Sequence, residues 1–282
     1  MKTILFKKIL VATDFSEQSK NAVKTASFIC QSQKATLILL HVVEDVVIFS
    51  QLEIRKSSLN YLPGMKDSAK KRLKRIANNI SRKYGIKVNI IVTEDITIEI
   101  SRVVQENNPD LIIIGTHGGS RFRRIFIGST MYRVIKHSQI PVMTVPGQGD
   151  WTSFSRILFP IRPVRKALEK YNFIRPIIQR NNSSLFVFGL TTERSIDKMF
   201  NIFVLVDQIK EWLRHDQIKF EIVFDHCNNY AEKILAKSEK IKADLIVITA
   251  TFDLTLAKFF IGPFAQQIIN HAKVPVLCIR PN

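Results

Sequence analysis

A glycine-rich segment directly after a short apolar run contains the residues of this chain best suited to chemistry. Residues 111–114 are all leucine or isoleucine, as expected of a buried strand. Gly115 and Gly118 open the loop that follows, and Gly128-Ser129 stands where a helix is expected to begin. Glycines let the backbone approach an anion closely, and free N–H groups at a helix start point toward it. This order of parts predicts a phosphate site and nucleotide binding.

Further side chains in the same segment are candidates for phosphate contact. Between the second and third glycines of the segment lie Arg121, Arg123 and Arg124. Guanidinium forks suit phosphate, but the same arginines could form a solvated basic loop. His117 could approach the phosphates or remain polar surface. Ser129 and Thr130 could bind phosphate through N–H and hydroxyl groups or serve only as helix caps.

The elements that must position this loop occur twice along the chain. The segment HSQIPVMTV at 137–145 corresponds to HAKVPVLCI at 271–279. This period is too long for a solenoid repeat. The sequence therefore predicts a duplicated domain, with one copy over 1–148 and a second over 149–282.

Short β-branched runs alternate with amphipathic stretches in each copy. Strands are expected over 8–13, 36–43, 88–93, 111–115, 142–145, 156–160, 184–190, 219–224, 245–249 and 276–279. Helices are expected over 16–31, 66–84, 97–107, 128–137, 164–180, 195–215, 229–240 and 263–271, with a long loop at 44–65. The alternation predicts a parallel sheet with helices on both faces. Ligands of such sheets bind at the carboxyl ends of the strands.

The chain is strongly basic. Its 282 residues carry a formal net charge of +18, and residues 1–150 contain 23 basic and 12 acidic side chains, so both copies are basic. Such charge could attract nucleic acid, anionic lipid or nucleotides, or form a solvated surface. Because no dedicated nucleic-acid motif is present, a nucleic-acid partner is not favoured.

Composition indicates an ordinary globular chain, 46% hydrophobic and 23% charged. We expect no signal peptide and no transmembrane segment, since no stretch approaches the roughly 18 apolar residues that a membrane span needs. Cys30, Cys227 and Cys278 are widely spaced in apolar surroundings and are expected to be buried free thiols. A reducing cytoplasm suits such thiols.

The first copy resembles the universal stress protein family, in its nucleotide-binding branch. The family signature is Gly, two residues, Gly, nine residues, Gly, then Ser or Thr, and Gly115, Gly118, Gly128 and Ser129 match every spacing. The opening ILVATDFS at 9–16 is also similar to the family pattern. The second copy is similar more weakly, so the whole chain resembles a tandem member of the family.

The resemblance implies a fold and a ligand. Each copy would be Rossmann-like and α/β, with a five-stranded parallel sheet of order 3-2-1-4-5, of the adenine nucleotide α-hydrolase-like type. The ligand would be ATP or another adenine nucleotide, with Mg²⁺ accompanying it. Asp14 would lie beside adenine and ribose, and Val42 would contact adenine through its backbone. The implied site residues are Asp14, Val42, Gly115, Thr116, His117, Gly118, Arg121, Gly128, Ser129 and Thr130.

The second copy departs from the signature. Arg162 stands where the first copy has Asp14, and Asp253 corresponds to Gly118. Gly262-Pro263 corresponds to Gly128-Ser129, so proline removes one N–H and no hydroxyl follows. The second site is therefore expected to be absent or altered, although Arg162 could bind another anion.

The resemblance also implies pairing between the copies. Segments 142–145 and 276–279 would pair as a pseudo-dimer within one chain, because each would otherwise expose an unpaired strand edge. The resemblance leaves open whether two tandem chains also form a homodimer.

The sequence is compatible with three alternative functions. The first is an ATP-binding protein of the stress response with an unknown protein partner. The second is a slow ATPase or nucleotidyl transferase, and the third is a basic protein that binds nucleic acid or an anionic surface. The sequence contains no Walker lysine and no paired acid and base, so no more than weak hydrolysis is expected.

Overall fold

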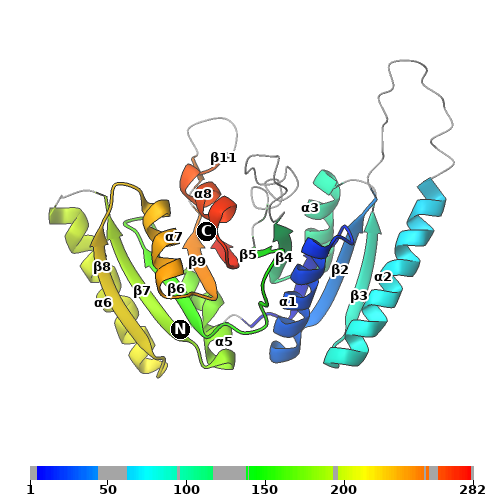
Figure 1. Cartoon of the computed structure of the whole chain (residues 1–282), viewed down its shortest axis with the longest axis horizontal. Coiled ribbons are helices and arrows are strands. Elements are labelled where there is room, and N and C mark those ends of the chain that lie inside the picture. Colours follow the sequence, from blue (N-terminus) through cyan, green and yellow to red (C-terminus); the bar gives the residue numbers. More distant parts are fainter. Residues whose placement is uncertain are drawn as a thin grey trace, which may run out of the picture.

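Strands from both halves of the chain form one ten-stranded sheet. The computed structural model describes residues 5–43, 62–93, 96–116, 138, 140–192, 196–250, 252–253 and 260–280. The strands of the first half are β1 (Lys8–Ala12), β2 (Thr36–Val42), β3 (Val88–Thr93), β4 (Leu111–Thr116) and β5 (Val142–Pro146). Those of the second half are β6 (Arg156–Ile161), β7 (Ser184–Thr191), β8 (Phe220–His226), β9 (Leu245–Thr249) and β12 (Val276–Ile279). Their order across the sheet is β3-β2-β1-β4-β5-β12-β9-β6-β7-β8 (Figure 1).

Each half is a parallel five-stranded unit with the same topology. β1 lies between β2 and β4, with Ile9 opposite Leu37 on one side and Leu111 on the other. β6 lies in the same way between β7 and β9. Counted within each half, the strand order is 3-2-1-4-5. The predicted α/β, Rossmann-like fold is confirmed.

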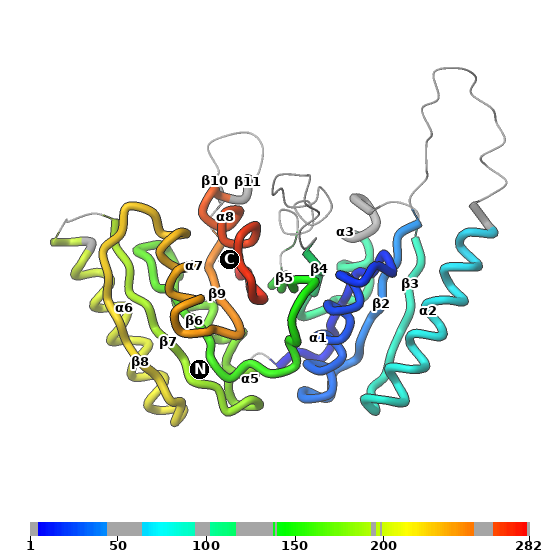
Figure 2. The backbone as a smooth tube through the Cα atoms, in the orientation of Figure 1, coloured from blue at the N-terminus to red at the C-terminus, as the bar shows by residue number. Residues whose placement is uncertain are grey.

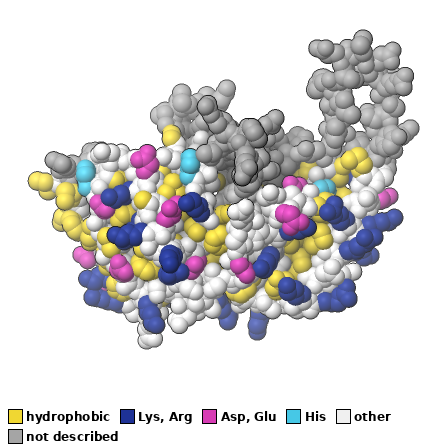
Figure 3. Space-filling model, viewed as in Figure 1, with side chains coloured by type: hydrophobic (Ala, Val, Ile, Leu, Met, Phe, Trp, Pro, Cys, Tyr) yellow, Lys and Arg dark blue, Asp and Glu magenta, His cyan; other side chains and the backbone are white. Residues whose placement is uncertain are grey.

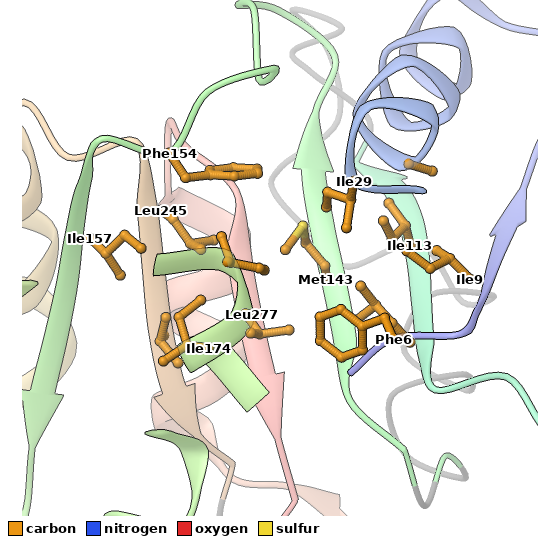
Figure 4. Packing of buried hydrophobic residues seen from close by; sticks show 14 of the residues in the cluster. Phe6, Ile9, Ile29, Ile113, Met143, Phe154, Ile157, Ile174, Leu245 and Leu277 are labelled. Carbon is orange, nitrogen blue, oxygen red and sulfur yellow. The ribbon is translucent and has the colours of Figure 1, made fainter. Parts of the chain in front are cut away.

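The two halves join through one antiparallel pair, β5 with β12. Val276 lies opposite Thr144, and Leu277 opposite Met143. Around this seam, side chains from both halves form one buried cluster, in which Met143 and Leu277 lie near Phe6 and Ile174 (Figure 4). The predicted pairing of the last strands is therefore confirmed, and the core continues across the seam.

Helices cover both faces of the sheet (Figure 2). The residues packed in one buried cluster come from α1 (Glu17–Gln33), α2 (Leu62–Tyr84), α5 (Lys170–Asn181) and α6 (Ile196–His215). Those of the second cluster come from α3 (Ile96–Asn107), α7 (Tyr230–Lys240) and α8 (Pro263–His271). Neighbouring strand residues alternate between the clusters because successive side chains of a strand point to opposite faces. Ile9 and Val11 belong to the first cluster, and Leu10 to the second.

Local signals explain where two helices begin or end. The Ser16 side chain caps α1 by accepting from the Ser19 N–H at 3.2 Å. Gly85, with φ +65°, follows α2, and its N–H donates to Ser81 O at 2.9 Å. Glycine takes this left-handed conformation without the steric cost of a Cβ. Both boundaries were readable in the sequence.

Helix α5 differs from the prediction. It begins at Lys170, whereas the pattern indicated a start at 164. Lys166 has φ +57°, a left-handed conformation that interrupts an α-helix. The N–H groups of Ala167 and Glu169 bond to carbonyls three residues back, so this stretch forms turns.

The structure contains a short hairpin that was not predicted, and two segments for which a structure was predicted lie outside the described residues. β10 (Phe252–Asp253) pairs antiparallel with β11 (Phe260–Ile261). Two-residue strands are too short to leave a hydrophobic period in the sequence. The helix expected at 128–137 lies outside the described residues. So does the expected loop over 44–61, while 62–65 form the start of α2.

Cys30, Cys227 and Cys278 are buried free thiols, as expected. Burial raises the pKa of the Cys30 and Cys278 thiols far above their ordinary value. Among the described residues, no helix is both long and apolar enough to cross a membrane.

Candidate functional site

A pocket of about 500 Å³ opens at the carboxyl ends of β1, β2 and β4. This volume lies within the roughly 300–1,000 Å³ typical of small-molecule sites. The described residues that line it are Ala12, Thr13, Asp14, Ser16, Gln18, Ser19, Leu40, His41, Val42, Val43, Met65, Ile114 and Gly115. The place agrees with the rule that parallel α/β sheets bind ligands beyond their strand ends.

Asp14 is the one acidic side chain among these lining residues. Its Oδ1 accepts from the Ser16 N–H at 2.9 Å and from the Ser16 hydroxyl at 2.6 Å. Partial burial acts to raise the pKa of Asp14, but the hydrogen bonds from Ser16 outweigh it and leave this pKa below its ordinary value. The carboxylate is therefore ionised near neutral pH and still exposed enough to accept a hydrogen bond from a ligand hydroxyl.

Gly115 lets β4 lie tightly against the start of α1. A Cβ at this position would lie 2.9 Å from Gln18 O and 3.3 Å from Ser19 Cα. Both of these neighbours are backbone atoms, which a side-chain rotation cannot move away. The glycine is thus required by the close approach of the strand to the helix, which also shapes the wall of the pocket.

The structure brings together three of the residues predicted for the site. Asp14, Val42 and Gly115 all line the pocket. Thr116 follows Gly115, but its hydroxyl donates to Val145 O at 3.4 Å, and it is not among the described lining residues. The remaining predicted positions lie outside the described residues: His117, Gly118, Arg121, Gly128, Ser129 and Thr130.

A stack of three side chains beside the pocket was not predicted. The Phe15 ring lies 4.2 Å from the His41 ring, and the Arg72 guanidinium lies 4.2 Å from the Phe15 centroid. His41 Nδ1 donates to Thr13 O at 2.7 Å. Phe15 has φ +66°, an uncommon conformation for a bulky residue that places it between the other two. Only the folded chain brings Arg72, on α2, to the first βα turn.

Gln18 was also missed. It is the second residue of α1 and lines the pocket, and it lies against Gly115 at the end of β4 and Gly147 just after β5. A Cβ on Gly147 would lie 2.7 Å from the Gln18 Cγ, close to where Gly115 meets the Gln18 backbone. Its position in the first turn of the helix that follows the first strand is the sequence signal that could have identified it, because ligands of such sheets bind at the strand ends.

The corresponding place in the second half is filled by protein. Arg162 is 9% exposed, and its guanidinium lies 3.5 Å from the Phe264 ring centroid. Its Nη2 donates to Thr249 O at 3.2 Å. Burial lowers the pKa of Arg162 to about 10. The space between Arg162, Lys170 and Phe264 is too small to hold a water molecule, so the place that corresponds to Asp14 and its pocket is closed among the described residues.

Lys170 is a second buried basic side chain at this place. It is 2% exposed, its Nζ donates to Pro160 O, and the Phe159 ring centroid lies 4.5 Å away. Burial, and next the charge of Arg162, lower the pKa of Lys170 well below its ordinary value.

Over the part of the chain that the structure describes, no three His, Cys, Asp or Glu side chains gather into a metal site.

Known proteins resemble this chain in sequence and in fold. The Universal stress protein family matches residues 5–146 and 210–280. Universal stress protein MJ0577 of Methanocaldococcus jannaschii is 31% identical over 156 residues, which are 51% of this chain and 96% of that protein. Universal stress protein MJ0531 of the same organism is 32% identical over 142 residues, 50% of this chain and 82% of that protein.

A solved structure extends the fold similarity to both halves. The crystal structure of a universal stress protein from Archaeoglobus fulgidus superimposes with a TM-score of 0.80 at 19% identity. The superposition covers 99% of this chain and 100% of that one, so the tandem arrangement is shared. With the family match present in each half, the chain belongs to the universal stress protein family, as a member with two tandem domains.

Proposed function

We propose that this chain is an ATP-binding regulatory protein of the stress response, with one nucleotide site in its first half. Membership of the universal stress protein family supports the stress-response role. The observation that carries the nucleotide site is the pocket of about 500 Å³ in which Asp14, Val42 and Gly115 meet at the strand ends. Binding would set the conformation of the loops around the pocket and thereby the choice of a protein partner.

The residues present fit an adenine nucleotide. Asp14 offers an ionised carboxylate as acceptor for the ribose hydroxyls, and Val42 ends β2 with backbone polar groups beside the pocket. The apolar side chains of Leu40 and Ile114 supply walls for a purine ring. Beyond Gly115, the sequence signature with Gly118, Gly128 and Ser129 supplies the groups expected to hold phosphate.

We expect Mg²⁺ to arrive with the nucleotide, held mainly by phosphates and water. Hydrolysis should be weak. Asp14 is the one carboxylate among the described lining residues, and its lowered pKa makes it a poor acceptor of a proton from water. The filled space at Arg162 and Phe264 supports a stoichiometry of one nucleotide per chain.

Mass spectrometry of nucleotide released from freshly purified protein, followed by calorimetric titration of the stripped protein with Mg-ATP, tests the proposal. We expect about one adenine nucleotide per chain. Asp14→Asn keeps an oxygen for Ser16 but loses the charge, so ATP should bind about 10- to 100-fold more weakly, as for loss of a charged hydrogen bond. Asp207→Asn, at an exposed position on α6, is the control with the same charge change.

Two results would refute the proposal. One is a wild-type protein that carries no nucleotide and ignores added ATP. The other is equal weakening of binding by Asp14→Asn and Asp207→Asn, which would mean that net charge rather than the pocket governs affinity.

A further inference from the structure

The charge of this chain is concentrated on one helix. Between Lys66 and Lys87, covering α2 and the turn after it, nine side chains are lysine or arginine and one, Asp67, is acidic, a net of +8 out of +18 for the chain. Dark-blue side chains accordingly line the edge of the molecule formed by α2 (Figure 3). This segment is less than a tenth of the sequence, so the surface charge is far from uniform.

The basic side chains of α2 share its outer face. Ala69, Leu73, Ala77 and Ile80 are buried, because the helix packs this stripe against β2 and β3. The exposed basic residues on its outer side are Lys70, Lys71, Lys74, Arg75, Arg82 and Lys83. Positions four apart on a helix lie on the same side. The cations therefore form a band that runs about 20 Å along the helix at 1.5 Å per residue.

The centre of this band lacks internal counter-charges. Lys70, Lys71, Lys74 and Arg75 make no ion pair with any described carboxylate, and their exposed faces point to solvent at the outer edge of the sheet. Arg72, by contrast, is held over the Phe15 ring beside the pocket. Uncompensated cations arranged in a row are attracted to a partner that carries regularly spaced negative charges.

We propose that the outer face of α2 binds the phosphate backbone of duplex nucleic acid without reading its sequence. A duplex carries one negative charge per about 1.7 Å of axis, and cations that neutralise its phosphates gain free energy by releasing counterions. The α2 band supplies point charges along a straight line and asparagine side chains at 78 and 79, and therefore matches a repeating phosphate backbone.

Two other polyanions fit this face less well. An amphipathic helix that binds a membrane inserts its apolar face into lipid, but the apolar stripe of α2 already packs on the sheet. Over residues 64–84 of this helix, Met65 is the one exposed large apolar side chain. Single strands are held by stacking of bases on aromatic rings. The aromatic Tyr84 is half-buried, with the Lys83 ammonium 5.3 Å from its ring centroid.

Fluorescence anisotropy of the full chain with a labelled 20-base-pair duplex of random sequence tests the proposal. The test variant replaces four α2 cations: Lys70→Gln, Lys71→Gln, Lys74→Gln and Arg75→Gln. The matched control removes four exposed lysines elsewhere: Lys7→Gln, Lys34→Gln, Lys219→Gln and Lys240→Gln. Because all eight side chains are exposed, both variants should keep the wild-type circular dichroism spectrum.

The wild type should bind the duplex tightly at 50 mM salt and weakly at 200 mM, and equally for unrelated sequences. In the α2 variant the affinity should fall at least about 10-fold. The slope of log K against log salt should become shallower by up to about 3.6, since four phosphate contacts are removed and each contributes about 0.9. The control should lose much less than the α2 variant.

Three results would overturn the proposal. The first is a wild type that does not bind the duplex at 50 mM salt. The second is an equal loss in both variants, which would assign binding to net charge. The third is co-flotation with vesicles of phosphatidylserine and phosphatidylcholine that depends on the α2 cations while the duplex is ignored, which would make the partner a membrane surface. Nucleotide content of the protein is not a readout here, so this test and that of the ATP site fail independently.

Discussion

At Gly115 the absence of a side chain is a structural requirement. A Cβ would meet backbone atoms of Gln18 and Ser19 at 2.9 to 3.3 Å, so the first turn of α1 would have to move away from β4. We expect Gly115→Ala to lower the free energy of unfolding by about 1–3 kcal/mol, the usual cost of overpacking, and to weaken ATP binding. Urea denaturation and calorimetric titration measure the two effects.

Gly64 provides the comparison for Gly115. It lies in α2, and a Cβ there would meet nothing within 4 Å. Gly64→Ala should therefore be neutral or stabilise the protein by about 0.5–1 kcal/mol, because alanine loses less backbone entropy in a helix. If both alanine variants behaved alike, the close approach at Gly115 would not govern its substitution.

The lowered pKa of the buried Lys170 predicts that the free energy of unfolding depends on pH. Burial holds its folded-state pKa well below the ordinary 10.5, so between these two values the unfolded chain binds more protons than the folded one. The stability of the wild type should then rise with pH up to about 10.5. Lys170→Met removes the buried amine and should be more stable at pH 7 by about 1–3 kcal/mol, with the gap closing as pH rises. Urea midpoints at pH 7, 8.5 and 9.5 measure it, and a variant less stable than wild type at pH 7 would contradict it.

At the scale of elements, the start of α1 links helix stability to the ionisation of Asp14. The Ser16 hydroxyl accepts from the Ser19 N–H and donates to Asp14 Oδ1. Ser16→Ala should cost about 1 kcal/mol as a lost N-cap. It should also raise the pKa of Asp14, because one bond to the carboxylate is lost. Stability that the ionised Asp14 provides at neutral pH would then be lost at a higher pH during acidification.

Urea denaturation and NMR titration of the Asp14 carboxyl check this. Asn229 caps α7 in the same way, accepting from Ala231 N–H at 2.9 Å. Asn229→Ala should cost a similar free energy and leave the Asp14 titration unchanged. An unchanged Asp14 pKa in Ser16→Ala would show that the backbone bond from Ser16 suffices.

Patterns that depend on local sequence predicted most elements, and contacts between distant elements account for what was missed. Apolar runs such as 36–40 identify buried strands because burial on both faces leaves no polar alternation. The late start of α5 follows from the backbone conformation at Lys166, which residue type does not encode. Two cation–π contacts, that of Arg72 with the Phe15 ring and that of Arg162 with the Phe264 ring, form only when separate elements pack together. The basic residues of α2 are present in the sequence, but the net charge of a whole half does not show that they are concentrated on one helix.

Over the whole molecule, the shared core at the β5–β12 seam predicts that the halves unfold together. Leu277 is fully buried opposite Met143, and Leu277→Ala should cost about 2–5 kcal/mol through the cavity it leaves. The chain has two tryptophans, Trp151 in the segment that joins β5 to β6 and Trp212 on α6. Single-tryptophan variants, Trp212→Phe and Trp151→Phe, should report the same urea midpoint, shifted equally by Leu277→Ala. Two separate midpoints would contradict this.

Joining β5 to β12 inside one polypeptide has an evolutionary consequence. When two identical subunits meet, a single codon change appears on both sides of the interface, whereas here each side is inherited separately. One side can therefore carry Arg162 at the place where the other carries Asp14. Because the two sides belong to one polypeptide, their pairing does not depend on the protein concentration. A difference in sequence between the two sides is thus fixed in every molecule at the moment of synthesis.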